Sequence, residues 1–141
     1  FGTLPNYLGN ANKLMSVVVQ LETPQALEQL EAIAQVDGVD AIFIGPADLS
    51  AAMGHVGHLT HPAVMTAMTQ AAQRCKALEI PVGTLAGSPE VAARYRAAGF
   101  DFIAVGSDLG LLMSAAQGAV AALRTPGSEH VHSLSSGTRG D

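Results

Sequence analysis

The sequence predicts an α/β protein in which short strands alternate with helices. Four short apolar runs recur along the chain, at residues 15–21, 41–44, 80–85 and 102–105. Longer segments separate these runs, and their apolar residues recur at the spacing of an amphipathic helix. Such repetition of strand and helix implies a parallel sheet that helices cover through right-handed crossovers.

The first strand–helix unit begins with three consecutive valines, which suit a strand buried on both faces. Thr23 and Pro24 then predict a helix start, because threonine is a good N-cap and proline suits the first helical position. Asp37 and Gly38 end the helical pattern. The residues expected to face inward from this helix are Ala26, Leu27, Leu30, Ile33 and Ala34.

The second unit starts with the strand at residues 41–44. The stretch "GPADLSAAMG" follows it, and we predict a loop with one short helix there. A longer helix is predicted over residues 62–78. The residues expected to face inward from this helix are Val64, Met65, Met68, Ala72, Cys75 and Leu78.

The last two units follow the same plan. After the strand at residues 80–85, Ser88 predicts a helix start and Gly99 the end of that helix. The strand at residues 102–105 leads into a final helix that ends near Leu123.

Two architectures fit four such units, a doubly wound sheet and a (β/α)8 barrel. The units occupy about 110 residues, whereas a complete barrel takes about 250. Four strands would not close a barrel, so in the barrel case the chain is half of one. We predict one partial domain over residues 1–124 and a disordered tail over residues 125–141, which has little to bury.

The composition excludes several classes of function. A net charge of −5 with seven Lys and Arg argues against nucleic acid or an anionic membrane as the partner. The apolar runs reach about seven residues, far short of the roughly 20 needed to cross a bilayer. The single cysteine, Cys75, excludes an intrachain disulfide and fits a reducing compartment, so we expect a cytoplasmic protein.

Polar side chains end the first strand and follow the second. Gln20 and Glu22 come after the valines, and Asp48 follows Gly45 and Pro46. Because consecutive parallel strands are usually neighbours, the two carboxylates are expected to face a gap that holds one divalent ion. Oxygen ligands favour Mg²⁺ or Mn²⁺ over Zn²⁺. In the alternative interpretation both acids are first-turn residues favoured by a helix dipole, and the glycine and proline only form a turn.

The segments "VVVQLET", "VDAIFIGPADLSAAMG", "HP", "PVGTLAG" and "GFDFIAVGSDLG" stand in this order along the chain. Together they resemble the C-terminal half of the HpcH/HpaI aldolase family, over about residues 1–124. The combination of "QLET" with "GPADLS" at this separation is the most specific part. The resemblance implies an α/β fold that is the C-terminal half, about four strand–helix units, of a (β/α)8 TIM barrel.

The resemblance also implies an activity. The family contains class II pyruvate aldolases, lyases of the EC 4.1.2 type that use a divalent metal to cleave a 4-hydroxy-2-oxo acid into pyruvate and an aldehyde. The implied metal is Mg²⁺ or Mn²⁺, with Co²⁺ as a further candidate. Such enzymes serve in the catabolism of aromatic compounds or sugar acids. For the full-length protein the resemblance implies a homo-oligomer, for example a hexamer.

Site residues can be carried over by position. Glu22 and Asp48 match the two metal ligands of the family, and the backbone N–H groups of Ala47 and Asp48 match the donors that hold the pyruvate carboxylate. Leu85 matches an apolar residue near the aldehyde pocket, although it equally fits a place in the core. The substrate-binding positions implied are Gln20, Gly45, Pro46, Ala47, Asp48 and Leu85.

The histidine base and the substrate-polarising arginine of the family have no match in this chain. His55, His58 and His61 lie in the loop after "GPADLS", and His61 is expected to begin a helix. The catalytic residues therefore stay unassigned, and we do not expect the 141 residues alone to be active. Two alternatives stay open: an acyl-CoA lyase of the related citrate lyase β-like branch, and a non-catalytic barrel fragment.

Overall fold

A computed structural model describes residues 5–124 of the chain. The predicted tail at residues 125–141 lies outside the described residues. The chain divides into two compact units, one that ends at Gly106 and one that begins at Ser107. The single domain predicted over residues 1–124 stays a prediction.

The first unit contains a parallel sheet of four strands in the order β1-β2-β3-β4. The strands are β1 (Val18–Leu21), β2 (Ala41–Ile44), β3 (Val82–Leu85) and β4 (Phe102–Ala104). All three neighbouring pairs are parallel. The predicted succession of strand–helix units, with consecutive strands as neighbours, is confirmed.

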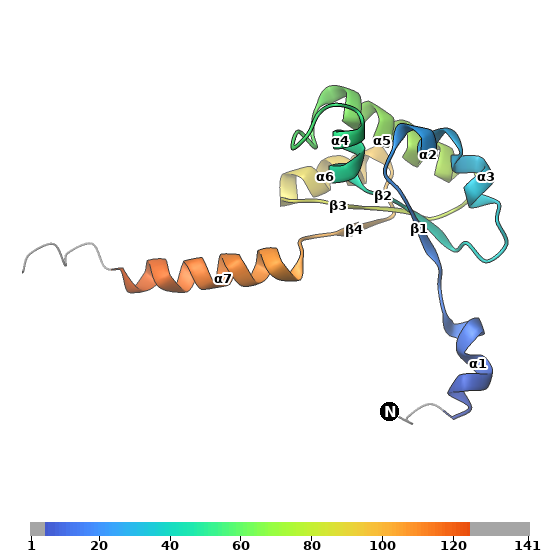
Figure 1. Cartoon of the computed structure of the whole chain (residues 1–141), viewed down its shortest axis with the longest axis horizontal. Helices are drawn as coiled ribbons and strands as arrows, with labels where there is room; N and C mark the ends of the chain where they lie inside the picture. The colour runs from blue at the N-terminus through green and yellow to red at the C-terminus, as the bar shows by residue number, and fades with distance from the viewer. Residues whose placement is uncertain (1–4, 125–141) are drawn as a thin grey trace, which may run out of the picture. The chain divides into compact units, whose positions relative to one another are not determined.

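Helices α2 to α6 lie on one side of these strands (Figure 1). Side chains that alternate along the strands point to that side, and those of Leu21, Ile42, Ile44 and Val82 are buried there within one core cluster. Tyr95 completes the core but its buried hydroxyl has no hydrogen-bond partner among the described residues. The helices within residues 5–124 are α1 (Tyr7–Leu14), α2 (Pro24–Glu28), α3 (Leu30–Ala34), α4 (Pro46–Ala52), α5 (Pro62–Ala77), α6 (Pro89–Ala98) and α7 (Asp108–Leu123).

Helix α5 buries the face that its sequence predicts. Val64, Met68, Ala72 and Cys75 are buried, whereas Met65 and Leu78 pack at the margin of the core and are partly exposed. Burial raises the pKa of the Cys75 thiol to about 11. The thiol is therefore protonated near neutral pH and is a poor nucleophile.

The other face of the sheet carries Val18 and Phe102, which are 48% and 39% exposed. The ring of Phe102 lies over β3, where a Cβ on Gly83 would come within 2.0 Å of it. A side chain at position 83 would therefore displace the Phe102 ring. Phe43 approaches the same ring, with 6.2 Å between ring centroids.

At the amino ends of the strands, two aspartates bind backbone groups of neighbouring strands. The N–H of Val17, just before β1, donates to Asp40 Oδ2 at 2.7 Å. The N–H of Val82, the first residue of β3, donates to Asp101 Oδ2 at 2.9 Å. Each aspartate precedes the next strand of the sheet, so these carboxylates tie neighbouring strand starts together.

Several predicted boundaries were wrong, and the reasons are local hydrogen bonds. Strand β1 begins at Val18 rather than at Met15, because the Met15 N–H donates to Ala11 O and ends α1, a helix that we did not predict. Strand β3 begins at Val82 rather than at Ile80, because the Ile80 N–H donates to Cys75 O in the last turn of α5.

Two other boundaries also differ. The first predicted helix is divided at Gln29 into α2 and α3, and Leu27 and Leu30, on either side of the break, are both buried in the core as predicted. Strand β4 ends at Ala104 rather than at Val105, because the ladder with β3 ends at the Leu85–Ala104 pair.

The predicted helix starts are confirmed by their capping bonds. The side chains of Thr23, Ser88, His61 and Ser107 each accept a hydrogen bond from a backbone N–H of the helix that follows. Gly99 ends α6 in the left-handed conformation, with φ of 101°. Side-chain chemistry at the helix ends was therefore readable from the sequence.

Candidate active site at the carboxyl ends of the strands

The register of the sheet places the predicted site residues along one edge. Leu21 pairs with Ile44, and Ile44 pairs with Thr84. The next residue on each strand is therefore Glu22, Gly45 or Leu85, and all three lie at the carboxyl ends of neighbouring strands. In parallel α/β proteins this edge carries the chemistry.

Gln20 and Glu22 lie directly against Gly45. The Gln20 side chain donates from Nε2 to Glu22 Oε2 at 2.6 Å. A Cβ on Gly45 would lie 2.8 Å from Gln20 Nε2 and 3.0 Å from Glu22 Oε2. The absence of a side chain at position 45 therefore lets both polar groups occupy the space above the end of β2.

The two predicted metal ligands differ in their helical context. Glu22 precedes Thr23, which is the N-cap of α2, so Glu22 is outside that helix and the interpretation of it as a first-turn residue is wrong. Asp48 does lie in the first turn of α4, which Gly45 caps and Pro46 begins. Glu22 is partly exposed and Asp48 is exposed, so both carboxylates can reach a ligand from solvent.

Oxygen donors on adjoining strands suit a divalent ion such as Mg²⁺ or Mn²⁺. Within residues 5–124 no group of three or more His, Cys, Asp or Glu side chains is placed to hold a metal. Two solvent-accessible carboxylates fit an ion that takes its other ligands from a substrate or water. The pairing of Glu22 with Asp48 around an ion stays a prediction.

Leu85 and Ala47 complete the predicted set. Leu85 ends β3 and is partly buried, which suits an apolar wall beside the site as well as the core. Ala47 is exposed in the first turn of α4, next to Asp48. Both positions therefore lie at the edge that carries Glu22.

Sequence reasoning missed two hydroxyl side chains beside this edge. Thr84 Oγ1 donates to the Ile44 carbonyl at 2.9 Å, and Ser50 Oγ donates to the Ala47 carbonyl at 2.7 Å. Both side chains are 0% exposed. A signal was present, because each is a polar residue inside an otherwise apolar segment, in "PVGTLAG" and "GPADLS".

Two of the three histidines in the loop after α4 contact each other. The rings of His55 and His61 stack with 3.6 Å between centroids. His61 Nδ1 accepts a hydrogen bond from the Ala63 N–H at the start of α5, as its predicted role in helix initiation requires. This capping bond occupies one ring nitrogen of His61.

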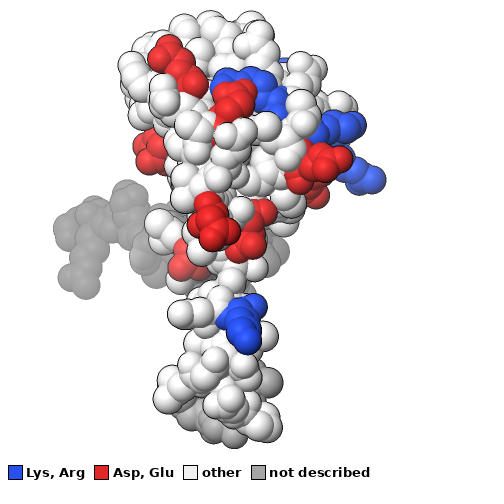
Figure 2. Space-filling view, turned by 90° about the vertical axis from the view of Figure 1, so that its right-hand side faces the viewer, with Lys and Arg blue, Asp and Glu red and all other residues white. Residues whose placement is uncertain are grey.

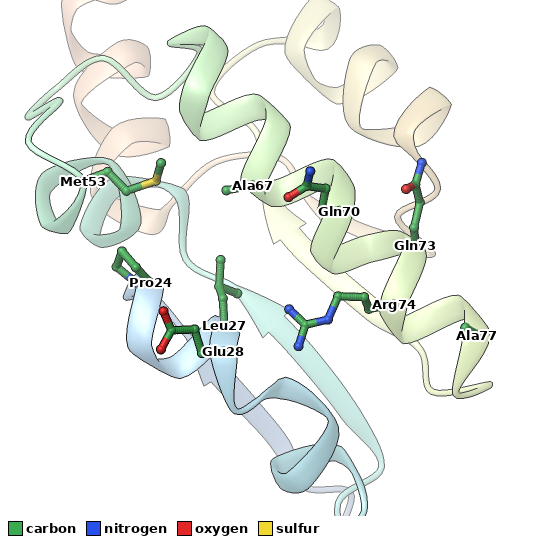
Figure 3. A pocket seen from close by; sticks show the side chains of 9 residues that line it. All are labelled: Pro24, Leu27, Glu28, Met53, Ala67, Gln70, Gln73, Arg74 and Ala77. Carbon is green, nitrogen blue, oxygen red and sulfur yellow. The ribbon is translucent and has the colours of Figure 1, made fainter.

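A groove of about 540 Å³ lies in the helix layer, between α2 and α5 (Figure 3). Glu28 and Arg74 are its charged residues, and Arg74 also pairs with Glu31. The groove does not include the predicted site residues. Its full lining is Pro24, Leu27, Glu28, Met53, Ala67, Gln70, Gln73, Arg74 and Ala77.

The charged side chains are distributed without a large basic patch on the face drawn in Figure 2, where acidic groups lie at several separate places. This distribution agrees with the net charge of −5. Among the described residues, no helix combines the length and apolar character that a membrane span requires.

Comparisons with known proteins agree on one family. A family model described as HpcH/HpaI aldolase/citrate lyase matches residues 3–115. The chain is 46% identical, over 117 residues, to 5-keto-4-deoxy-D-glucarate aldolase of Enterobacter sp. strain 638, a match that covers 83% of this chain and 46% of that protein. It is 43% identical, over 124 residues, to 2-dehydro-3,6-dideoxy-6-sulfogluconate aldolase of Pseudomonas putida, a match that covers 88% of this chain and 49% of that protein.

A solved structure has the same arrangement of strands and helices. The crystal structure of an HpcH/HpaI aldolase/citrate lyase family protein from Burkholderia cenocepacia J2315 superposes with a TM-score of 0.76 at 39% sequence identity. The match covers 89% of this chain and 49% of that one. The chain therefore spans about half the length of the relatives it matches.

Proposed function

Because this chain belongs to the HpcH/HpaI aldolase/citrate lyase family, we propose that it supplies the metal-binding and oxo-acid-binding half of a class II pyruvate aldolase. The proposed reaction is the cleavage of a 4-hydroxy-2-oxo acid into pyruvate and an aldehyde. The names of the relatives, aldolases that act on sugar acids and a sulfonated sugar acid, favour a substrate of the sugar-acid type.

The observation that carries the proposal is the close approach of Gln20 and Glu22 to Gly45 at the carboxyl ends of β1 and β2. Glu22 is partly exposed and Asp48 is exposed at this edge, so the oxygen atoms of both carboxylates are available to a bound cation. We assign Glu22 and Asp48 as its ligands. Mg²⁺ or Mn²⁺ is the proposed metal.

The remaining residues of the edge would bind the oxo acid. Gln20 has its amide at the mouth of the site and would hydrogen-bond the keto acid. The backbone N–H groups of Ala47 and Asp48, in the first turn of α4, would hold its carboxylate. Gly45 leaves room for the Gln20 and Glu22 side chains beside the substrate, and Leu85 would form an apolar wall on the aldehyde side.

The chemistry is cleavage of the bond between C3 and C4 of the substrate. Its electron pair moves toward the keto group, the 4-hydroxyl loses its proton to a base, and C3 gains a proton to give pyruvate. A bound divalent ion supplies Lewis-acid stabilisation of the negative charge that develops on the keto oxygen. We assign no residue among 5–124 as the base. We propose that the base belongs to the region that corresponds to the unmatched half of the relatives.

A partner surface is also part of the proposal. Helix α7, taken by itself, has Leu109, Leu112 and Leu123 among its exposed apolar side chains and Asp108 as its charged residue. Exposed apolar side chains in such number favour contact with another surface. We propose a homo-oligomer for the full-length protein, in the cytoplasm.

Metal binding tests the proposal directly. The full 141-residue chain should bind Mn²⁺ in titration calorimetry, and more tightly when oxalate, a mimic of a 2-oxo acid, is present. Glu22→Gln and Asp48→Asn should each weaken Mn²⁺ binding by about 100-fold, because each removes a charged ligand. Glu28→Gln, an exposed change on α2, is the matched control and should leave binding unchanged.

A chimeric enzyme tests the activity. The unmatched half of the Enterobacter aldolase would be joined to this chain, and release of pyruvate from a 4-hydroxy-2-oxo acid would be measured with Mn²⁺ or Mg²⁺. Activity that disappears with Glu22→Gln supports the proposal. A folded chimera that turns over an acyl-CoA thioester, or one in which Glu22→Gln changes nothing, would contradict it.

A further inference from the structure

Two buried hydroxyl groups converge on the segment that joins β2 to α4. Apart from Tyr95, Thr84 and Ser50 are the buried polar side chains in the described part of the chain. Each donates its hydrogen bond to a carbonyl of residues 44–48, the segment that ends in Asp48. The polar groups inside the core are thus directed at the backbone of the candidate site.

The bond from Thr84 is the first of a chain of hydrogen bonds across three strands. Thr84 Oγ1 on β3 donates to the Ile44 carbonyl, which belongs to the same peptide group as the Gly45 N–H. The Gly45 N–H in turn donates to the Leu21 carbonyl at 3.0 Å. Leu21 immediately precedes Glu22, so this chain of bonds ends beside the first predicted metal ligand.

The bond from Ser50 acts on the second ligand. The Ala47 carbonyl, which Ser50 contacts at 2.7 Å, belongs to the peptide group that leads into Asp48. The bond restrains that peptide and hence the backbone from which the Asp48 side chain extends. Hydrogen bonds in series also polarise the peptide groups that they share.

Packing alone does not account for either hydroxyl. Thr84 lies on the same strand face as Val82, where a valine has nearly the same shape and an equally high preference for strands. Ser50 lies within α4, where alanine is the better helix former. The hydrogen bond that each hydroxyl makes is therefore the better explanation for its presence.

We propose that Thr84 and Ser50 are positioning residues that hold the ends of β1 and β2 so that Glu22 and Asp48 can share one divalent ion. The inference rests on the proposed function. It adds two residues that touch neither the ion nor the substrate and act through the backbone of residues 44–48.

The test measures metal affinity and stability in the same variants. Thr84→Val should weaken Mn²⁺ binding to the full chain by about tenfold, as loss of a supporting partner of a metal ligand typically does. Ser50→Ala should do the same and provides a second variant at an independent position. The midpoint temperature of thermal unfolding of both variants should stay within a few degrees of that of the unsubstituted chain.

Two comparisons separate positioning from general stability. Tyr95→Phe removes another buried hydroxyl, one without a partner among the described residues, and should leave Mn²⁺ binding unchanged. Thr84→Ser keeps the donor and should restore most of the affinity lost in Thr84→Val. If both Thr84→Val and Ser50→Ala bind Mn²⁺ as tightly as the unsubstituted chain does, the inference is overturned but the proposed function is not. Absence of Mn²⁺ binding by the unsubstituted chain would overturn the proposed function, and the inference with it.

Discussion

Acidic residues at the two ends of the sheet have different partners. At the amino ends, the carboxylates of Asp40 and Asp101 accept hydrogen bonds from the backbone N–H groups of Val17 and Val82. At the carboxyl ends, Glu22 accepts a hydrogen bond from another side chain, and Asp48 is exposed at the start of a helix. The first pair is engaged with the fold, and the second is available to a ligand.

This difference gives a physical criterion for a functional acid in an α/β protein. A carboxylate that accepts a backbone N–H stabilises the native state, and its loss leaves that donor without its partner. A carboxylate that faces solvent and accepts no backbone N–H contributes little to folding. Substitutions at the two ends should therefore separate loss of binding from loss of stability.

Of three further substitutions that compare the two ends of the sheet and the helix layer, Gly45→Ala at the carboxyl end is expected to have the largest effect. The new methyl group would come within 3.0 Å of polar atoms of Gln20 and Glu22 and displace them. We expect Mn²⁺ affinity to fall by about 10- to 100-fold. Because the displaced atoms belong to flexible side chains, the free energy of unfolding should change by about 1 kcal/mol or less. A stability loss without a loss of affinity would contradict the comparison.

A smaller effect, a loss of stability without a loss of Mn²⁺ affinity, is expected from Asp101→Ala at the amino end. The Val82 N–H would lose its acceptor, which costs about 1–2 kcal/mol of stability. For a domain of this size the midpoint of thermal unfolding should fall by about 4–8 °C per kcal/mol. Mn²⁺ binding should be unaffected, and Asp101→Asn, which keeps an oxygen acceptor, is the matched control.

The smallest effect is expected at Glu31, a structural acid in the helix layer. A hydrogen bond from Arg74 lowers the pKa of the Glu31 carboxyl from 4.5 to about 2. The pair therefore stabilises the fold above about pH 4.5, and this contribution is lost as the pH falls toward 2. At pH 7 the midpoint temperature of thermal unfolding should be slightly lower for the Glu31→Gln variant than for the unsubstituted chain. This difference should disappear near pH 2. A difference that stays constant over this range would show that the ion pair is not its cause.

Much of the fold was predictable, because its local signals are strong. The capping residues Thr23 and Ser88 identified helix starts, and the apolar period of α5 identified its buried face. Strand boundaries were less accurate. The N–H groups of Met15 and Ile80 bond to preceding helices, and such competition for a backbone donor depends on geometry that composition does not record.

By itself the sequence determined the family and the parallel order of four strand–helix units, because its motifs and apolar periods are local properties of the chain. It also placed Glu22, Gly45 and Asp48 after the strands to which they belong. Only the tertiary structure decided which residues support them. Thr84 is 40 residues from Ile44 in the chain, and the hydrogen bond between them exists because β3 pairs with β2. Contacts across a sheet are set by register, and register follows from the packing of the whole unit rather than from any one segment.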